Sequence, residues 1–269
     1  MYLADYHIHS RISPDAGDSM TALAEAGLAA GLAEVCFTDH VEPVVWGGTA
    51  LRESYDWAAL AAEFDAAKAN VGDRMVLRLG IELGDACWSV ERTEALLRDA
   101  PPLDFVIGSV HMLSRRYGGL DLYYFDPKTE EEAYAGIADY LDQVRKMIAW
   151  GRFTVLGHLT LPLRYLNENR GFRLSFDRFE PEMREIFRSL IDKGLGIEVN
   201  TNRGGTPLPD GKWLRLYREL GGELVTLGTD AHSADFVGCA IRERQALLRE
   251  CGFARFCTFA GQKPVWHEL

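Results

Sequence analysis

Short apolar runs and longer helical segments alternate along almost the whole chain, and this alternation restricts the folds open to it. Runs such as Phe105-Val106-Ile107 have the length and composition of strands, whereas segments such as 56–70 and 130–149 are amphipathic helices in pattern. Strands that are apolar almost throughout are typical of a parallel sheet covered by helices. About seven such units fit a distorted β/α barrel better than an open doubly wound sheet. No Gly-x-Gly-x-x-Gly follows the first strand, which argues against dinucleotide binding.

The same pattern places the individual elements. The predicted strands are residues 5–10, 34–38, 75–83, 105–107, 153–156, 196–199, 224–227 and 255–259. The predicted helices are residues 21–33, 56–70, 90–99, 130–149, 175–193, 210–220 and 238–251. Asp56 is suited to cap the second of these helices. Two connections, 43–55 with Trp46, Gly47 and Gly48 and 112–129, are longer than usual, which predicts loops over a site.

Six of the seven histidines stand in or directly after a predicted strand. His7 and His9 are two residues apart in the first strand, so their side chains are expected on the same face. The other polar residues in equivalent positions are His40, Glu82, His111, His158, Asp230 and His232. In a β/α barrel the C-terminal strand ends meet at one mouth, where the chemistry takes place. Each histidine alone would be explained as a buried core or capping residue, but the whole set together indicates a metal centre.

The types of donor limit the choice of metal and the class of protein. Imidazoles and carboxylates without thiolates suit Zn, Fe or Mn better than Ca or Mg. The five cysteines are scattered, with no Cys-x-x-Cys pair, which disfavours both a zinc finger and a disulfide framework. A formal charge of −11 disfavours binding of long nucleic acid. We read no signal peptide and no apolar run of the ~18–20 residues that a membrane span needs. These features predict a cytoplasmic protein.

Several short motifs resemble, in order, the signatures of the polymerase and histidinol phosphatase (PHP) superfamily. The motifs are His7-Ile8-His9, Thr38-Asp39-His40, Gly80-Ile81-Glu82, Ser109-Val110-His111, Gly157-His158 and Thr229-Asp230-Ala231-His232. They run from residue 5 to about residue 238. The resemblance implies a distorted (β/α)7 barrel, in one domain of residues 1–269, with a trinuclear metal site at the C-terminal ends of the strands.

The resemblance also implies how the ligands are shared among three divalent ions. One ion would be held by His7, His9, Glu82 and Asp230. A second would be held by Glu82, as a bridge, with His111 and His158, and a third by Asp15, His40 and His232. Asp15 has an alternative role as a turn or cap residue. Asp5 and Asp39 are expected to orient the ligand histidines, as residues around a metal commonly do, and Glu198 to support the barrel or a neighbouring group.

Two arginine segments favour the histidinol phosphatase branch of the superfamily. Arg164 follows shortly after His158, and Arg203 follows Glu198-Val199-Asn200 at the end of the next strand. The second segment resembles the Glu-x-Asn segment of monofunctional histidinol phosphatases, in which arginines hold the phosphate. Guanidinium groups suit bidentate phosphate binding, although both arginines could instead be solvated loop residues.

We therefore expect a metal-dependent phosphomonoesterase that hydrolyses L-histidinol phosphate in histidine biosynthesis. Asp230 is a candidate proton acceptor as well as a metal ligand. One alternative is a phosphoesterase of the same superfamily that acts on nucleotides or short oligonucleotides. Another, of a different class, is a metal-binding scaffold or sensor without catalysis. A small phosphorylated substrate is the only partner that the sequence indicates.

Overall fold

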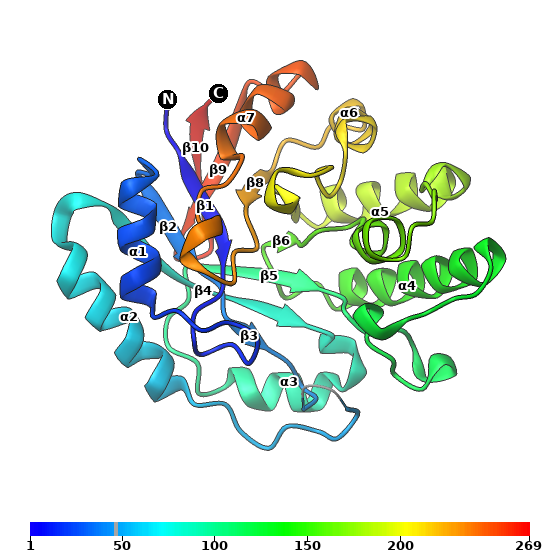
Figure 1. Cartoon of the computed structure of the whole chain (residues 1–269), viewed down its shortest axis with the longest axis horizontal. Helices are drawn as coiled ribbons and strands as arrows, with labels where there is room; N and C mark the ends of the chain where they lie inside the picture. The colour runs from blue at the N-terminus through cyan, green and yellow to red at the C-terminus, as the bar shows by residue number, and fades with distance from the viewer. Residues whose placement is uncertain (46–47) are drawn as a thin grey trace.

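Parallel strands form a nearly closed barrel in the computed structural model, which describes residues 1–45 and 48–269 (Figure 1). In order around the sheet, the strands are β1 (Ala4–Ile8), β2 (Glu34–Phe37), β4 (Val76–Gly84), β5 (Phe105–Ser109), β6 (Val155–Leu156), β7 (Gly196–Asn200) and β8 (Val225–Gly228). All neighbours in this order pair in parallel. The short strand β3 (His40–Val41) pairs with the second half of β4, opposite Glu82. The expected distorted (β/α)7 barrel is confirmed.

The barrel closes between β1 and the chain that follows β8. Ile8 forms an isolated parallel bridge with Ala231, and the His9 amide donates to the Ala231 carbonyl at 2.8 Å. The Asp230 amide donates to the His7 carbonyl, also at 2.8 Å. Residues from the two ends of the sequence are therefore brought together at the C-terminal ends of the strands.

Helices surround the barrel on its outer side (Figure 1). They are α1 (Met20–Ala29), α2 (Trp57–Val71), α3 (Val90–Leu97), α4 (Glu130–Trp150), α5 (Glu180–Asp192), α6 (Gly211–Glu219) and α7 (Ile241–Glu250). The side chain of Asp56 accepts a hydrogen bond from the Ala59 amide at 2.9 Å, as expected for the N-cap of α2. In α4 the residues at helical spacing that face the barrel, among them Ile137, Leu141 and Val144, are buried. No described helix is both long and apolar enough to cross a membrane.

Several helices are shorter than predicted, and in α1 and α5 the reason is local. α1 ends at Ala29 rather than near residue 33, because Gly31 adopts a φ of 74° and turns the chain away. α5 begins at Glu180 rather than at residue 175, with Pro181 in its first turn. Proline favours that position because its fixed φ suits the helix and its missing N–H is not needed there.

The last predicted strand does not add a unit to the barrel. β9 (Arg255–Ala260) pairs antiparallel with β10 (Lys263–Glu268), which the sequence did not predict. The Phe259 amide donates to Tyr6 Oη at 3.0 Å, and the Gly261 amide donates to the Asp104 carboxylate just before β5. The hairpin thus packs at the N-terminal ends of the strands and leaves the opposite mouth open.

Candidate active site

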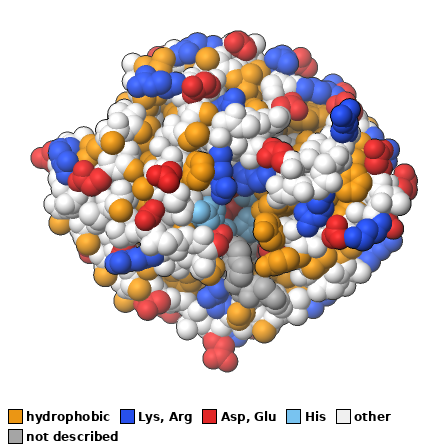
Figure 2. All heavy atoms as spheres, in the orientation of Figure 1, with side chains coloured by type: hydrophobic (Ala, Val, Ile, Leu, Met, Phe, Trp, Pro, Cys, Tyr) orange, Lys and Arg blue, Asp and Glu red, His pale blue; other side chains and the backbone are white. Residues whose placement is uncertain are grey.

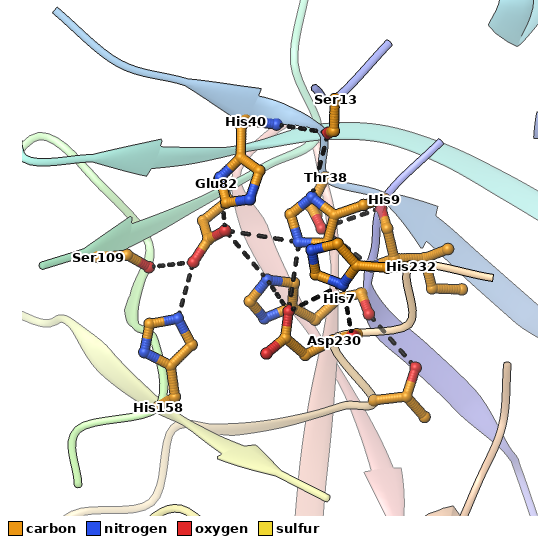
Figure 3. A network of polar contacts seen from close by, with 12 residues as sticks. His7, His9, Ser13, Thr38, His40, Glu82, Ser109, His158, Asp230 and His232 are labelled. Carbon is orange, nitrogen blue, oxygen red and sulfur yellow. Dashed lines mark hydrogen bonds and ion pairs between the residues drawn. The ribbon is translucent and has the colours of Figure 1, made fainter. Parts of the chain in front are cut away.

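The polar residues that follow the barrel strands meet in one cluster at the open mouth (Figure 3). His7 lies in β1, Glu82 in β4 and His40 in β3, while Asp230 follows β8. The structure brings all the predicted ligands to this cluster: His7, His9, Asp15, His40, Glu82, His111, His158, Asp230 and His232. A cavity of about 700 Å³ opens above them, and Figure 2 shows the histidines at the bottom of this hollow.

Four donors surround one point beneath the cavity. His7 Nε2 lies 3.4 Å from Glu82 Oε2 and 3.6 Å from Asp230 Oδ1, and His9 Nε2 lies 3.5 and 3.4 Å from the same oxygens. Neither Nε2 has a hydrogen-bond partner, although both imidazoles are completely buried. Donors held about 2.0–2.1 Å from a tetrahedral ion are about 3.4 Å apart. The spacing and the unsatisfied nitrogens therefore fit a metal ion between these four residues.

Glu82 faces a second group of donors with its other oxygen. His158 Nε2 lies 2.8 Å from Glu82 Oε1, and His111 Nε2 lies 3.2 Å from it. Ser109 Oγ donates to the same oxygen at 2.6 Å and fixes the carboxylate. Since Glu82 Oε2 faces His7 and Oε1 faces His158, its carboxylate is placed to bridge two neighbouring ions.

A third group lies on the other side of His9. Asp15 Oδ2 lies 2.9 Å from His232 Nε2 and 3.7 Å from His40 Nε2. The ring of His9 lies 4.3 Å, between centroids, from the rings of both His40 and His232, and the centroids of those two rings are 6.0 Å apart. The Asp15 side chain is about one-third exposed (34%) and faces the cavity. The structure thus places the Asp15 carboxylate among imidazoles.

Glu198 orients two of the cluster histidines from below. Its Oε1 lies 2.6 Å from His7 Nδ1, and its Oε2 accepts from the His158 amide at 2.7 Å. A Cβ on Gly228 would lie 2.4 Å from both His7 Cβ and Glu198 Oε1, so only glycine permits this close approach. Carboxylates that hold the far nitrogen of a ligand histidine fix its tautomer and ring direction.

Arg164 reaches the cluster from the wall of the cavity. Its Nη1 donates to Asp230 Oδ2 at 2.7 Å, its Nε to Asn202 Oδ1 at 2.7 Å and its Nη2 to Asn200 Oδ1 at 2.9 Å. Arg203 lines the same cavity and is exposed, with its guanidinium 5.0 Å from the centre of the Phe236 ring. The two predicted phosphate-binding arginines therefore face one space, directly beside the donor cluster.

The sequence motifs and the geometry of the site agree with the chain's similarity to known proteins. The PHP domain family matches residues 5–202 of the chain. The chain belongs to the PHP domain family. It is 29% identical to the histidinol-phosphatase of Lactococcus lactis over 265 residues, covering 96% of this chain and 95% of that protein. A probable histidinol-phosphatase of Thermotoga maritima is 25% identical over 99% of this chain and 100% of its own length.

One solved structure is similar to this chain over nearly the whole length of both. It is the crystal structure of histidinol phosphate phosphatase from Lactococcus lactis, complexed with zinc, L-histidinol and phosphate. The TM-score is 0.79 at 27% sequence identity, with 98% of each chain covered. A putative histidinol phosphatase from Listeria monocytogenes, 16% identical with a TM-score of 0.73, shares the fold.

Neighbouring groups of opposite charge shift the pKa values of the residues in this PHP site. Burial alone would lower the pKa of His7, but the carboxylates of Glu198, Glu82 and Asp230 raise it well above its usual value. Burial alone would raise the pKa of Asp230, but His7 and Arg164 hold it well below the usual range. The carboxylate of Asp230 is therefore ionised, as a metal ligand must be.

The backbone of this PHP site has a positive φ at three of the predicted residues, one of which is His158 with a φ of 21°. Asp230 has a φ of 58° and Arg203 a φ of 51°, both in the left-handed region that side chains rarely adopt. Such conformations cost about 1–3 kcal/mol each and persist where the surrounding structure enforces them. At Asp230 the hydrogen bonds of barrel closure and of Arg164 provide that enforcement.

Asp5 and Asp39 contact no imidazole directly: Asp5 accepts a hydrogen bond from the amide of His7 at 3.4 Å, and Asp39 reaches His9 only through Ser13. Asp39 accepts from the amides and hydroxyls of Ser10 and Ser13, and Ser13 Oγ in turn lies 3.2 Å from His9 Nδ1. Asp5 accepts from the amide and hydroxyl of Thr229 at 2.9 and 2.6 Å. Both carboxylates hold the backbone that carries the metal-donor residues, so they orient the imidazoles only indirectly.

One wall of the cavity was not predicted from the sequence. Residues Arg164–Asn169 form a π-helical turn, which contributes Tyr165, Glu168 and Asn169 beside Arg164. Only their proximity to Arg164 in the chain could have indicated them, because no residue pattern marks a π-helical turn. The predicted loop 112–129 does reach the cavity, through Asp121, Tyr123 and Tyr124. In the loop 43–55, Trp46 and Gly47 lie outside the described residues.

Proposed function

We propose that residues 1–269 form one catalytic domain that hydrolyses L-histidinol phosphate to L-histidinol and phosphate, a step of histidine biosynthesis. The observation that carries the proposal is the meeting of a metal-type donor cluster and two arginines in a single cavity. The named relatives support the same reaction, since a histidinol phosphate phosphatase with a similar structure binds zinc, L-histidinol and phosphate.

The residues of the cluster would hold three divalent ions, with Zn, Fe and Mn as the candidates for this donor set. His7, His9, Glu82 and Asp230 would hold the first ion. Glu82, His111 and His158 would hold the second, and Asp15, His40 and His232 the third. Bound ions of this kind polarise phosphoryl oxygens and lower the pKa of water to about 7.

The side chains of the chain itself would bind and orient the phosphoryl group. Arg164 and Arg203 would neutralise negative charge on its oxygens, and the hydrogen bonds from Arg164 to Asn202 and Asn200 hold its guanidinium ready for this role. We assign acceptance of the proton from the attacking water to Asp230. Its Oδ2 is engaged by Arg164, and its Oδ1, which faces His7 and His9, would also be a donor to the first ion, so one carboxylate would serve both roles.

The part of the cavity wall formed by the π-helical turn and the loop 112–129 suits the leaving group. Tyr123 and Tyr165 meet edge to face, with ring centroids 5.7 Å apart, and Glu168 and Asp121 add carboxylates nearby. L-Histidinol carries an ammonium group and a planar imidazole. An aromatic and acidic wall therefore complements its charge and shape.

Phosphate release from L-histidinol phosphate tests the proposal, with enzyme of measured metal content. A panel of nucleotide and sugar phosphates and a short single-stranded oligonucleotide provides the competing substrates. We expect selective turnover of L-histidinol phosphate that is lost in His9→Ala. Strong metal binding with faster release from nucleotides or the oligonucleotide would overturn the substrate assignment, and metal binding without any hydrolysis would make the protein a scaffold or sensor.

A further inference from the structure

Glu42 is a buried carboxylate on the opposite side of His111 from Glu82. It follows β3, and its side chain is only 6% exposed. Its Oε1 lies 3.4 Å from His111 Nδ1 and also 3.4 Å from His40 Nδ1. One carboxylate thus faces two of the candidate ligands, which belong to two different ion positions.

The imidazole of His111 is held between two carboxylates. Its Nε2 lies 3.2 Å from Glu82 Oε1, the oxygen that faces the second ion position, whereas its Nδ1 faces Glu42 Oε1. A histidine that binds a metal through Nε2 keeps its proton on Nδ1. The carboxylate of Glu42 is the acceptor placed for that proton.

His40 has a related arrangement. Its Nε2 faces Asp15 Oδ2 at 3.7 Å, and its Nδ1 lies 3.1 Å from Glu82 Oε2 in addition to its approach to Glu42. Binding of the third ion through Nε2 would therefore also direct the Nδ1 proton toward Glu42 and Glu82.

We propose that Glu42 is a positioning residue that accepts the Nδ1 protons of His111 and His40 and so fixes both rings toward their ions. The proposal rests on the metal centre of the proposed function, but not on the identity of the substrate. Glu198 provides the precedent within this chain, because its carboxylate already lies 2.6 Å from His7 Nδ1. Glu42 serves the second and third ion positions as Glu198 serves the first.

Gly84 is the residue that lets Glu42 and His111 approach each other. A Cβ at this position would lie 2.8 Å from Glu42 Cγ, 2.9 Å from Glu42 Oε1 and 3.0 Å from His111 Nδ1. Gly84 ends strand β4, and its φ is not in the left-handed region, so alanine would cause no backbone strain there. Gly84→Ala should therefore push the Glu42 carboxylate and the His111 ring apart while Glu42 itself remains.

Metal affinity provides a test that does not depend on catalysis. Wild type, Glu42→Ala, Glu42→Gln and Gly84→Ala are stripped of metal and titrated with Zn²⁺ against a chromophoric chelator. Each is then loaded with Co²⁺ for absorption spectra. We expect Glu42→Ala to weaken at least one site by about 10–100-fold and to change the Co²⁺ spectrum, as loss of such a partner usually does. Glu42→Gln retains one acceptor oxygen, so it should lose less Zn²⁺ affinity than Glu42→Ala. Gly84→Ala should also lower the Zn²⁺ affinity.

Glu34→Gln is the matched control. Glu34 is equally buried, at 2% exposure, but it lies at the start of β2 and accepts hydrogen bonds from Tyr2, Tyr6 and Arg78. The Glu34→Gln substitution should lower the melting temperature of the metal-free protein without changing its Zn²⁺ affinity. The melting temperatures of the Glu42 variants without metal show whether weaker metal binding comes from lost positioning of the imidazoles or from loss of folding.

Two results would overturn the proposal. One is a Glu42→Ala protein with wild-type Zn²⁺ affinity and Co²⁺ spectrum. The other is a Glu42→Gln protein that binds one ion fewer even at saturating Zn²⁺, which would make Glu42 a direct ligand. If the wild type binds no metal, the proposed function fails. If it binds metal and the variants bind equally well, only the role of Glu42 fails.

Discussion

Arg164 donates a hydrogen bond from Nη1 to Oδ2 of Asp230 at 2.7 Å, while Oδ1 of the same carboxylate faces His7 and His9. A single carboxylate thus connects the arginine proposed to bind phosphate with the proposed metal centre. Substitutions at Arg164 are therefore expected to disturb both parts of the site, unlike substitutions at Arg203, whose guanidinium lies over Phe236.

Arg164→Lys should lower kcat/KM for L-histidinol phosphate by about 10²–10³-fold, the range found when a charge-stabilising donor is removed. Lysine cannot reproduce the three-way contact of the guanidinium with Asp230, Asn202 and Asn200. Steady-state kinetics beside Arg203→Lys provide the comparison, and we expect the smaller loss at Arg203. Equal activity of Arg164→Lys and wild type would contradict the proposed role.

Removal of metal should abolish phosphate release and lower the melting temperature. The imidazoles of His7 and His9 are buried with unpaired Nε2 atoms, which bound ions would satisfy. A ligand that binds only the folded state at about 1,000 times its Kd stabilises it by about 4 kcal/mol. Thermal unfolding of chelator-treated protein, before and after addition of Zn²⁺, Mn²⁺, Fe²⁺ or Mg²⁺, measures the effect. The same stabilisation by Mg²⁺ as by Zn²⁺ would argue against an imidazole-rich centre.

Glu168→Gln should raise KM for L-histidinol phosphate by roughly tenfold, because one charge-assisted contact to a cation contributes about 1.5 kcal/mol. The amide can still pair with Asn202, whose Nδ2 donates to Glu168 Oε1 at 2.7 Å, so the cavity wall should keep its shape. Hydrolysis of a phosphomonoester with an uncharged leaving group serves as the control and should be unaffected. An equal loss with both substrates would exclude recognition of the cationic group by Glu168.

Cys87 should react slowly with alkylating reagents at pH 8. Burial raises the pKa of its thiol to about 11, and the nearby Lys146 does not offset this. The reactive thiolate is therefore scarce until the pH approaches that value. Since the folded state holds the proton more tightly than the unfolded state, this thiol also reduces stability as the pH rises from about 9 to about 11. Pulse alkylation with peptide mapping across this range measures the profile, and rapid labelling at pH 8 would refute it.

The sequence was sufficient to predict the barrel because its information is local and repeated. Each strand is an apolar run that ends in a polar residue, and the packing of parallel strands under helices turns that pattern into one mouth. The candidate ligands follow from the same logic, since a residue such as His158 or Glu82 needs only its position after a strand to be placed in the cluster.

The remaining parts of the site depend on contacts that no local pattern encodes. The position of the π-helical turn Arg164–Asn169 depends on Arg164, which donates hydrogen bonds to Asn202 and Asp230 far along the chain. Glu42 was not recognised because its partners come from β3 and from the chain after β5. The hairpin β9–β10 was half predicted, because the exposed β10 has no apolar run to reveal it.

Closure of the barrel between β1 and the residues after β8 has a consequence for how the protein is made. Asp230 and His232 are synthesised more than 220 residues after His7 and His9. A nascent chain that ends before Asp230 cannot offer the complete first ligand set. Ion capture at the first position would thus follow synthesis of the chain through β8, when the barrel can close.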